Sequence, residues 1–245
     1  MKTLSLRKIS IGISTLLCAL ALGLTNGQFA FAAESEAPIS APDSELAYFG
    51  ENTSIKNSLI GLTDILRTMK RDGASESEVN AYYEQYMNQQ RRLRYDLDGY
   101  INDQLNSQEQ DLYDEDPVNA LLCMANGVFA LEYAEDYYSA SVLHNGNGDA
   151  FRHVLWNYGM YIDVGYNFAK SWSDAHEYGS NGPALERQMD LYNNAVGLEL
   201  GEDNPSTILH STFKNKSRQK VRDGECKIFS SSGTSLTWSN SAGEL

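Results

Sequence analysis

Three groups of acidic, imidazole and amide side chains follow one another within residues 145–201, each in a segment with helical periodicity. Asp149 and His153 are four residues apart, and so are Asp190 and Asn194. Side chains at this spacing project from one face of a helix, one turn apart. Carboxylate, imidazole and amide groups that converge from three helices have the composition of a metal or acid–base site. This stretch therefore predicts a helical domain arranged around a polar centre.

The apolar periodicity ahead of this stretch predicts an N-terminal helical hairpin over residues 54–106. Its first helix is expected to cover residues 54–71. Ser75 and Glu78 have the spacing of a capping box, which starts the second helix. That second helix is predicted to run to about Leu105, and the hairpin to pack against or shield the domain that follows.

Residues 107–224 are predicted to form the helical domain that carries the polar groups. Its core spine is the strongly apolar segment 118–138, which should be a helix. A helix over residues 149–168 follows a glycine-containing turn. A further helix is expected to hold His176, and another to cover residues 184–200.

The tail, residues 225–245, is rich in serine, threonine and glycine and holds two short runs of β-type composition. It is predicted to be irregular or to form a small β-hairpin. The predicted fold class is therefore mainly α: a helical bundle domain with an N-terminal helical hairpin and a short irregular or β-hairpin tail.

Residues 1–32 have the composition of a secretory signal peptide. Basic residues precede a mostly apolar run over residues 9–24, and Ala30-Phe31-Ala32 supplies small residues at a cleavage site. The apolar run is too short to be a membrane span, and no later segment is apolar for long enough. We expect residues 33–53 to be a disordered linker and the product to be secreted and extracellular.

The formal net charge of −14 becomes −17 once the leader is removed, because the leader carries three basic residues and no acidic ones. A surface this acidic repels phosphate backbones over most of its area, which argues against broad nucleic-acid binding. It leaves room for a local phosphate pocket around one arginine. The sequence does not identify a partner, and an envelope component or a small molecule fits it.

Two cysteines lie outside the leader, Cys123 and Cys226. In an oxidising compartment they could form a disulfide that closes a loop of about 100 residues and contributes about 4–5 kcal/mol in the chain-entropy model. The alternative is a buried free thiol at Cys123, which stands in an apolar run. The sequence favours neither over the other.

Asp149 and His153 fit two interpretations. They are either a metal-binding or catalytic pair, in which the carboxylate fixes the imidazole tautomer, or a helix N-cap and a half-buried histidine. Arg152 beside them either clamps a phosphate or carboxylate through two hydrogen bonds or closes an ion pair with an acidic neighbour, such as Glu177 or Asp190.

His176 and Glu177 are adjacent, so on an ideal helix they point about 100° apart and cannot both face one point. Either one acts while the other supports it, or the helix ends there. Asn193 and Asn194 are unfavourable inside a helix. A pair of amides there either bonds backbone across a helix contact or orients a ligand.

The three polar groups make up a three-part pattern: Asp149-Ala150-Phe151-Arg152-His153, Ala175-His176-Glu177 and Met189-Asp190-Leu191-Tyr192-Asn193-Asn194-Ala195-Val196-Gly197. This pattern resembles a bacterial domain family of uncharacterised function that occurs in exported proteins and at the C-terminal ends of toxin-like repeat proteins. The similarity covers roughly residues 108–222. The resemblance implies a shared site, and its occurrence at toxin ends favours a hydrolase.

The working hypothesis is an exported hydrolase, metal-dependent, that acts on a phosphodiester or a cell-envelope component. A divalent metal ion is the cofactor class that fits, with Asp149, His153, His176 and Asp190 as candidate ligands. The alternative is a non-catalytic secreted binding or interaction module whose polar cluster is a structural hydrogen-bond network. The candidate catalytic residues are Asp149, Arg152, His153, His176, Glu177, Asp190 and Asn194.

Overall fold

The structure is a computed structural model that describes Tyr48 and residues 53–179, 182–206 and 210–241. The predicted signal peptide and almost all of the predicted linker lie outside the described residues. Within the described part, none of the helices combines the length and the apolar character that a membrane crossing requires.

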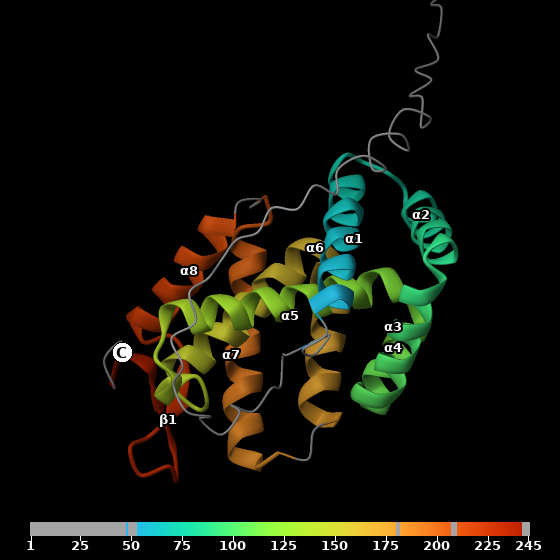
Figure 1. Cartoon of the computed structure of the whole chain (residues 1–245). Helices are drawn as coiled ribbons and strands as arrows, with labels where there is room; N and C mark the ends of the chain where they lie inside the picture. Colours follow the sequence, from blue (N-terminus) through green and yellow to red (C-terminus); the bar gives the residue numbers. More distant parts are fainter. Residues whose placement is uncertain (1–47, 49–52, 180–181, 207–209, 242–245) are drawn as a thin grey trace, which may run out of the picture. The chain divides into compact units, whose positions relative to one another are not determined.

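The described chain is mainly helical, with one small antiparallel sheet near its C-terminus, so the predicted fold class is confirmed (Figure 1). The helices are α1 (Thr53–Arg71), α2 (Glu76–Gln89), α3 (Arg91–Gln104), α4 (Ser107–Glu115), α5 (Pro117–Tyr137), α6 (Asn147–Gly179), α7 (Ala184–Asp203) and α8 (His210–Asp223). Short 3₁₀ turns lie at η2 (Ala140–Val142) and η3 (Ser239–Ser241), and the strands are β1 (Lys227–Phe229) and β2 (Leu236–Trp238).

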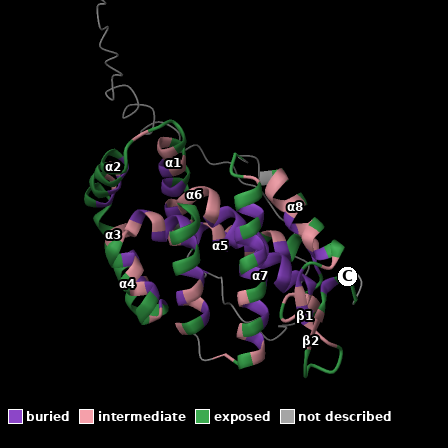
Figure 2. Ribbon diagram, turned by 180° about the vertical axis from the view of Figure 1, so that it is seen from behind, coloured by how far each residue is buried: buried purple, intermediate pink, exposed green. Residues whose placement is uncertain are grey.

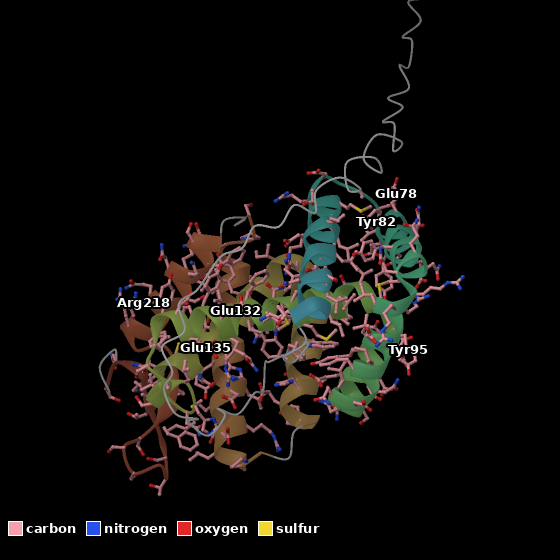
Figure 3. All side chains as sticks on the ribbon, in the orientation of Figure 1. Glu78, Tyr82, Tyr95, Glu132, Glu135 and Arg218 are labelled. Carbon is pink, nitrogen blue, oxygen red and sulfur yellow. The ribbon has the colours of Figure 1, made fainter. Side chains whose placement is uncertain are left out.

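The second helix of the predicted hairpin is two helices, which is a correction to the sequence interpretation. The capping box at Ser75 and Glu78 starts α2 as predicted. Gln90 then leaves helical geometry, with φ −101° and ψ 57°, and α3 begins directly after it. The break lets α2 and α3 both direct apolar residues inward, while Tyr95 projects from the outer side of α3 (Figure 3).

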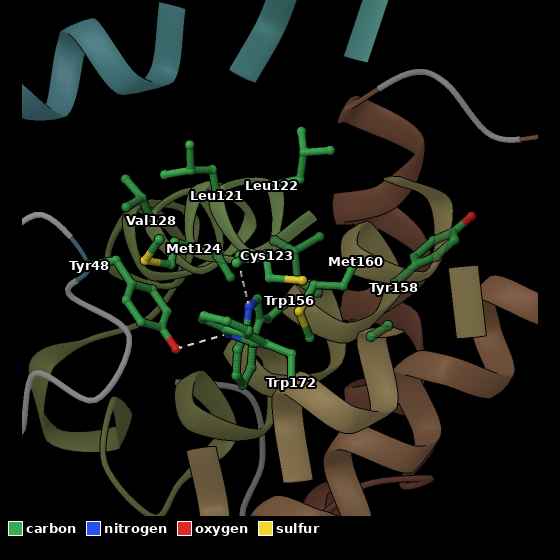
Figure 4. Close-up of a cluster of buried hydrophobic side chains, with 14 of the residues drawn as sticks. Tyr48, Leu121, Leu122, Cys123, Met124, Val128, Trp156, Tyr158, Met160 and Trp172 are labelled. Atoms are coloured by element: carbon green, nitrogen blue, oxygen red, sulfur yellow. Dashed lines mark hydrogen bonds between the residues drawn. The ribbon is translucent and has the colours of Figure 1, made fainter. Parts of the chain in front are cut away.

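α5 is the core spine, as its apolar sequence predicts, and it is buried along most of its length (Figure 2). It packs against α6, and α6 packs in turn along α7. The indole of Trp156 donates to the carbonyl of Cys123 at 3.0 Å, and the indole of Trp172 donates to the hydroxyl of Tyr48 at 3.3 Å (Figure 4). These two hydrogen bonds satisfy the indoles inside an otherwise apolar cluster.

The two helices predicted around residue 168 form one run, α6, with a kink at Gly165. Gly165 has φ 77° and ψ 167°, a conformation that side chains with a Cβ rarely adopt. No atom lies within 4 Å of a Cβ built at this position. The requirement for glycine is therefore one of backbone conformation and not of space.

Replacing Gly165 by alanine is expected to lower the unfolding free energy by about 1–2 kcal/mol, because the backbone must keep a positive φ. Gly99→Ala is the matched control, since Gly99 is in a regular part of α3 and also has open space around a Cβ. Chemical denaturation of both variants measures the difference. Equal or greater stability of Gly165→Ala would show that the kink is not strained.

The tail forms a β-hairpin, which is one of the two structures that the sequence predicts for it. β1 pairs antiparallel with β2, with Ile228 opposite Thr237. Asn193 of α7 holds β1 at both polar atoms: its Nδ2 donates to the carbonyl of Lys227, and its Oδ1 accepts from the Lys227 amide, each at 2.9 Å. The sequence left two roles open for this asparagine, bonding to backbone or orienting a ligand. In the structure Asn193 bonds to backbone, and that backbone belongs to a strand.

The disulfide considered for Cys123 and Cys226 is not formed. Both residues are buried free thiols, as the alternative interpretation described for Cys123. Burial raises the pKa of Cys123 well above its usual range and raises the pKa of Cys226 to about 12. Because the thiolate is the reactive form, both residues should be inert in the folded chain.

We therefore expect neither thiol to react with iodoacetamide in the native protein at pH 8, and both to react once the chain is unfolded without a reductant. Mass spectrometry of the resulting peptides measures the labelling of Cys123 and of Cys226 separately and distinguishes both from Cys18. A disulfide would give a different pattern, with no labelling in denaturant until a reductant is added.

Candidate functional site

The side chain at the centre of the polar cluster is His153, which α6 places in the interior with no exposed surface. Its Nδ1 lies 3.0 Å from Oδ1 of Asn194 on α7. Its Nε2 lies 3.4 Å from Oδ1 of Asp149 and 3.4 Å from Oδ1 of Asp190. Three of the sequence-predicted residues thus surround the imidazole, with Asn194 at one ring nitrogen and the two aspartates at the other.

The orientation of Asn194 fixes the tautomer of His153. Nδ2 of Asn194 donates to Oε1 of Glu177 at 2.8 Å, so its Oδ1 must face the imidazole. The same Oδ1 also accepts from Nδ2 of Asn157 at 2.6 Å. An amide oxygen can only accept, so Nδ1 of His153 carries the hydrogen.

As a result, Nε2 of His153 faces two carboxylates. Within the described part of the chain it makes no hydrogen bond of good geometry. In a neutral imidazole with hydrogen on Nδ1, Nε2 presents a lone pair, which the oxygens of Asp149 and Asp190 would repel. A positive charge at Nε2, carried either by a proton or by a metal ion, removes that repulsion.

In the chain without a metal ion, the charges around His153 favour the protonated imidazole. Burial alone lowers the pKa of His153, but the charges of Asp190, Asp149 and Glu177 raise it to about 10. Burial also raises the pKa of Asp149, but the guanidinium of Arg152 and the imidazole hold that pKa well below its usual range. The centre therefore contains three carboxylates, one guanidinium and one imidazole.

Arg152 is a positioning residue for Asp149. Its Nη2 donates to Oδ1 of Asp149 at 2.6 Å, and both side chains are buried. The other carboxylate oxygen accepts from the backbone amide of Asn145 at 2.5 Å, in the turn before α6. Asp149 is thus inside the first turn of a helix that begins at Asn147, not the N-cap considered from the sequence.

His176 is not part of this centre, which corrects its place among the candidate metal ligands. Its Nδ1 lies 2.8 Å from Oε1 of Glu109 on α4. The ring of Trp156 packs edge-on against both histidines, with its centroid 6.3 Å from that of His153 and 5.3 Å from that of His176. Adjacent positions on α6 point in different directions, so Glu177 faces one cluster and His176 the other.

Glu109 is the partner of His176 that sequence reasoning missed. Its Oε1 also accepts from the hydroxyl of Tyr48 at 3.0 Å, and its Oε2 accepts from the amide of Asn106 at 3.0 Å. The spacing of Asn106 and Glu109 is a capping-box signal, and the structure has that box at the start of α4. The signal marked a helix start and gave no sign that the glutamate also binds His176.

Asp149, His153 and Asp190 each offer a ligand atom, and these atoms lie within 4.8 Å of one another. Two carboxylates and an imidazole are suitable ligands for a divalent transition-metal ion. The centre is not the open cleft that a catalytic site usually occupies, because all three side chains are at most 2% exposed. Asn194 is the residue that also lines a cavity of about 170 Å³ along α6 and α7.

The family described as "Domain of unknown function (DUF6973)" matches residues 111–225, so a domain of this uncharacterised family is present in the chain. The match spans α5 to α8 and includes Asp149, His153, Glu177, Asp190 and Asn194. It leaves out α1, α2 and α3, which agrees with the extent of the resemblance noted in the sequence. Comparison with curated proteins and with solved structures gave no match.

Proposed function

We propose that this domain is a metal-dependent hydrolase whose divalent ion is held by Asp149, His153 and Asp190. The observation that carries the proposal is the Nε2 atom of His153, which is fixed in its tautomer by Asn194 and directed between two carboxylates at 3.4 Å. The bound ion would supply a Lewis acid and lower the pKa of a bound water.

The other side chains of the centre position these ligands. Arg152 holds Asp149 through a 2.6 Å hydrogen bond, and Glu177 holds Asn194, which in turn orients His153. Partners of this kind orient metal ligands and raise their basicity. Arg152 is engaged with Asp149, so the clamp on developing negative charge considered from the sequence is not the role we assign to it.

A phosphodiester or a cell-envelope component is the proposed substrate class. Support for access comes from Asn194, which contacts His153 on one side and lines the cavity along α6 and α7 on the other. A substrate that enters this cavity would reach the centre by displacing or passing Asn194. The buried ligands would then act in a site from which bulk water is excluded.

The activity test uses bis(p-nitrophenyl) phosphate and purified cell-envelope material as substrates, with Mn²⁺ or Zn²⁺ added. We expect Asp190→Asn to lower turnover at least ~100-fold, since it removes a charged ligand. Asp96→Asn, on α3 and paired with Arg92 at 2.9 Å, should leave turnover unchanged, because Asp96 is neither in the centre nor on the wall of the cavity along α6 and α7. Turnover that survives Asp190→Asn, or that is absent for every substrate while the metal is bound, would contradict the hydrolase proposal.

A second candidate function is an interaction module in which the centre is structural. Burial favours it, because Asp149, His153, Asp190 and Asn194 are nearly inaccessible. Buried polar networks hold helices in one arrangement when their polar atoms are satisfied. This candidate predicts the same loss of stability on mutation but no bound metal, so metal content separates the two.

We also propose that the protein is exported and acts outside the cell. The basic, apolar and small-residue segments of residues 1–32 support this proposal. N-terminal sequencing of the protein recovered from culture medium should begin at Ala33. Recovery of the full-length chain from the cytosolic fraction alone would contradict it.

A further inference from the structure

A cavity of about 640 Å³ lies on the side of α6 that faces away from the His153 centre. Residues of α1, α5, α6 and α8 line it, including Leu155 and Gly159 of α6. Its volume falls in the range of small-molecule sites. One part of its wall is apolar and aromatic, formed by Phe129, Tyr133, Leu155, Ile162 and Phe213.

The charge of this cavity is opposite to that of the whole chain. Its wall carries four cationic side chains and two carboxylates, a formal charge of +2, whereas the chain has a formal net charge of −14. The cations are Arg67, Lys70, Arg71 and Lys214, and the carboxylates are Asp64 and Asp163. A dianion would be attracted here and repelled by most of the remaining surface.

Arg67 is held in one orientation. Its Nε donates to Oδ2 of Asp163 at 2.6 Å, and its Nη1 donates to Oδ1 of Asp64 at 3.0 Å. Asp163 is fixed in turn by Nδ2 of Asn126 at 2.7 Å, and the guanidinium carbon lies 5.5 Å from the centroid of the Phe129 ring. A guanidinium fixed in this way is pre-organised to bind an anion.

One hydrogen-bond donor of Arg67 is left over. Nη2 is buried and has no hydrogen-bond partner among the described residues. Because Nη2 is out of contact with the cavity, Arg67 acts on an anion there through its charge. Across the cavity, Nζ of Lys214 lies 4.1 Å from the centroid of the Tyr133 ring, which adds a second cation beside an aromatic wall.

We infer that this cavity binds a phosphate monoester that carries a small aromatic or aliphatic group. The dianionic phosphate matches the +2 charge of the wall, and the organic group packs against Phe129, Tyr133 and Phe213. The inference does not rest on the proposed hydrolase, because the residues involved are not those of the His153 centre.

The test is isothermal titration calorimetry with phenyl phosphate, in the presence of a chelator so that a metal centre contributes nothing. We expect one saturable site with a Kd below ~1 mM. Inorganic phosphate and phenylacetate should each bind less tightly, because one lacks the ring and the other carries a single charge. Vesicles that contain phosphatidic acid form a separate arm, since a lipid headgroup is another source of the same monoester.

Arg67→Gln should weaken phenyl phosphate binding at least ~10-fold, and Lys214→Gln several-fold. Arg92→Gln is the matched control, because Arg92 is 84% exposed and paired with Asp96 at a distance from the cavity. If Arg67→Gln lowers the melting temperature, Lys214→Gln carries the test. Absence of saturable binding, binding to vesicles alone, or binding that both variants leave unchanged would overturn the inference.

Discussion

Replacing His153 by alanine is expected to destabilise the domain by roughly 3–5 kcal/mol, the cost of removing one partner from a buried charged group. The imidazole is completely buried, and the carboxylates of Asp149 and Asp190 lie 3.4 Å from its Nε2. Without it, those two carboxylates face each other in the interior with a cavity between them. Oδ1 of Asn194 also loses the hydrogen bond that it accepts from Nδ1 of His153.

Equilibrium denaturation of the chelator-treated protein measures this effect. His144→Ala is the matched control: His144 is 40% exposed and lies 3.4 Å from Glu186, so its removal should cost less than ~1 kcal/mol. A His153→Ala variant whose stability equals that of the control would mean that the charges of the centre are solvated in solution.

Gly197→Ala is expected to cost about 3 kcal/mol, the upper part of the range for overpacked cores. A Cβ at this position would lie 2.5 Å from the carbonyl oxygen of Val154 and 2.7 Å from Cβ of Asn157. The first of these atoms is backbone, so α6 and α7 would have to move apart. That separation would also lengthen the contacts between His153 on α6 and Asn194 on α7.

Urea denaturation compares Gly197→Ala with Gly99→Ala, which should be neutral or stabilising because its Cβ meets nothing within 4 Å. Nuclear magnetic resonance of the His153 ring gives a second readout. The Nδ1 hydrogen, protected by Asn194 in the wild type, should exchange faster in Gly197→Ala. A variant with unchanged stability and unchanged exchange would contradict the close approach of the two helices.

Sequence signals that involve only neighbouring residues predicted the helices that those residues start or stabilise. The capping box of Ser75 and Glu78 starts α2, and the apolar run of α5 forms the core spine. The four-residue spacings keep Asp149 and His153 on one face of α6, and Asp190 and Asn194 on one face of α7. Packing of α6 against α7 then brings these two faces together.

The parts that sequence could not supply depend on contacts between distant segments. The break at Gln90 has neither proline nor glycine to mark it, and it is set by packing of α2 and α3 on the core. His176 pairs with Glu109, 67 positions away, and nothing local distinguishes that partner from the other acidic residues. How deeply the His153 centre is buried likewise depends on how the helices pack against one another.

The central claim is that Asp149, His153 and Asp190 form a metal centre, and metal content after equilibrium dialysis tests it most directly. Wild-type protein dialysed against Mn²⁺ or Zn²⁺ and then against metal-free buffer should retain about one ion per chain. Asp190→Asn should retain at least ~10-fold less, while Asp96→Asn should match the wild type. Wild-type protein that retains no ion, or an Asp190→Asn variant that retains as much as the wild type, would contradict the claim.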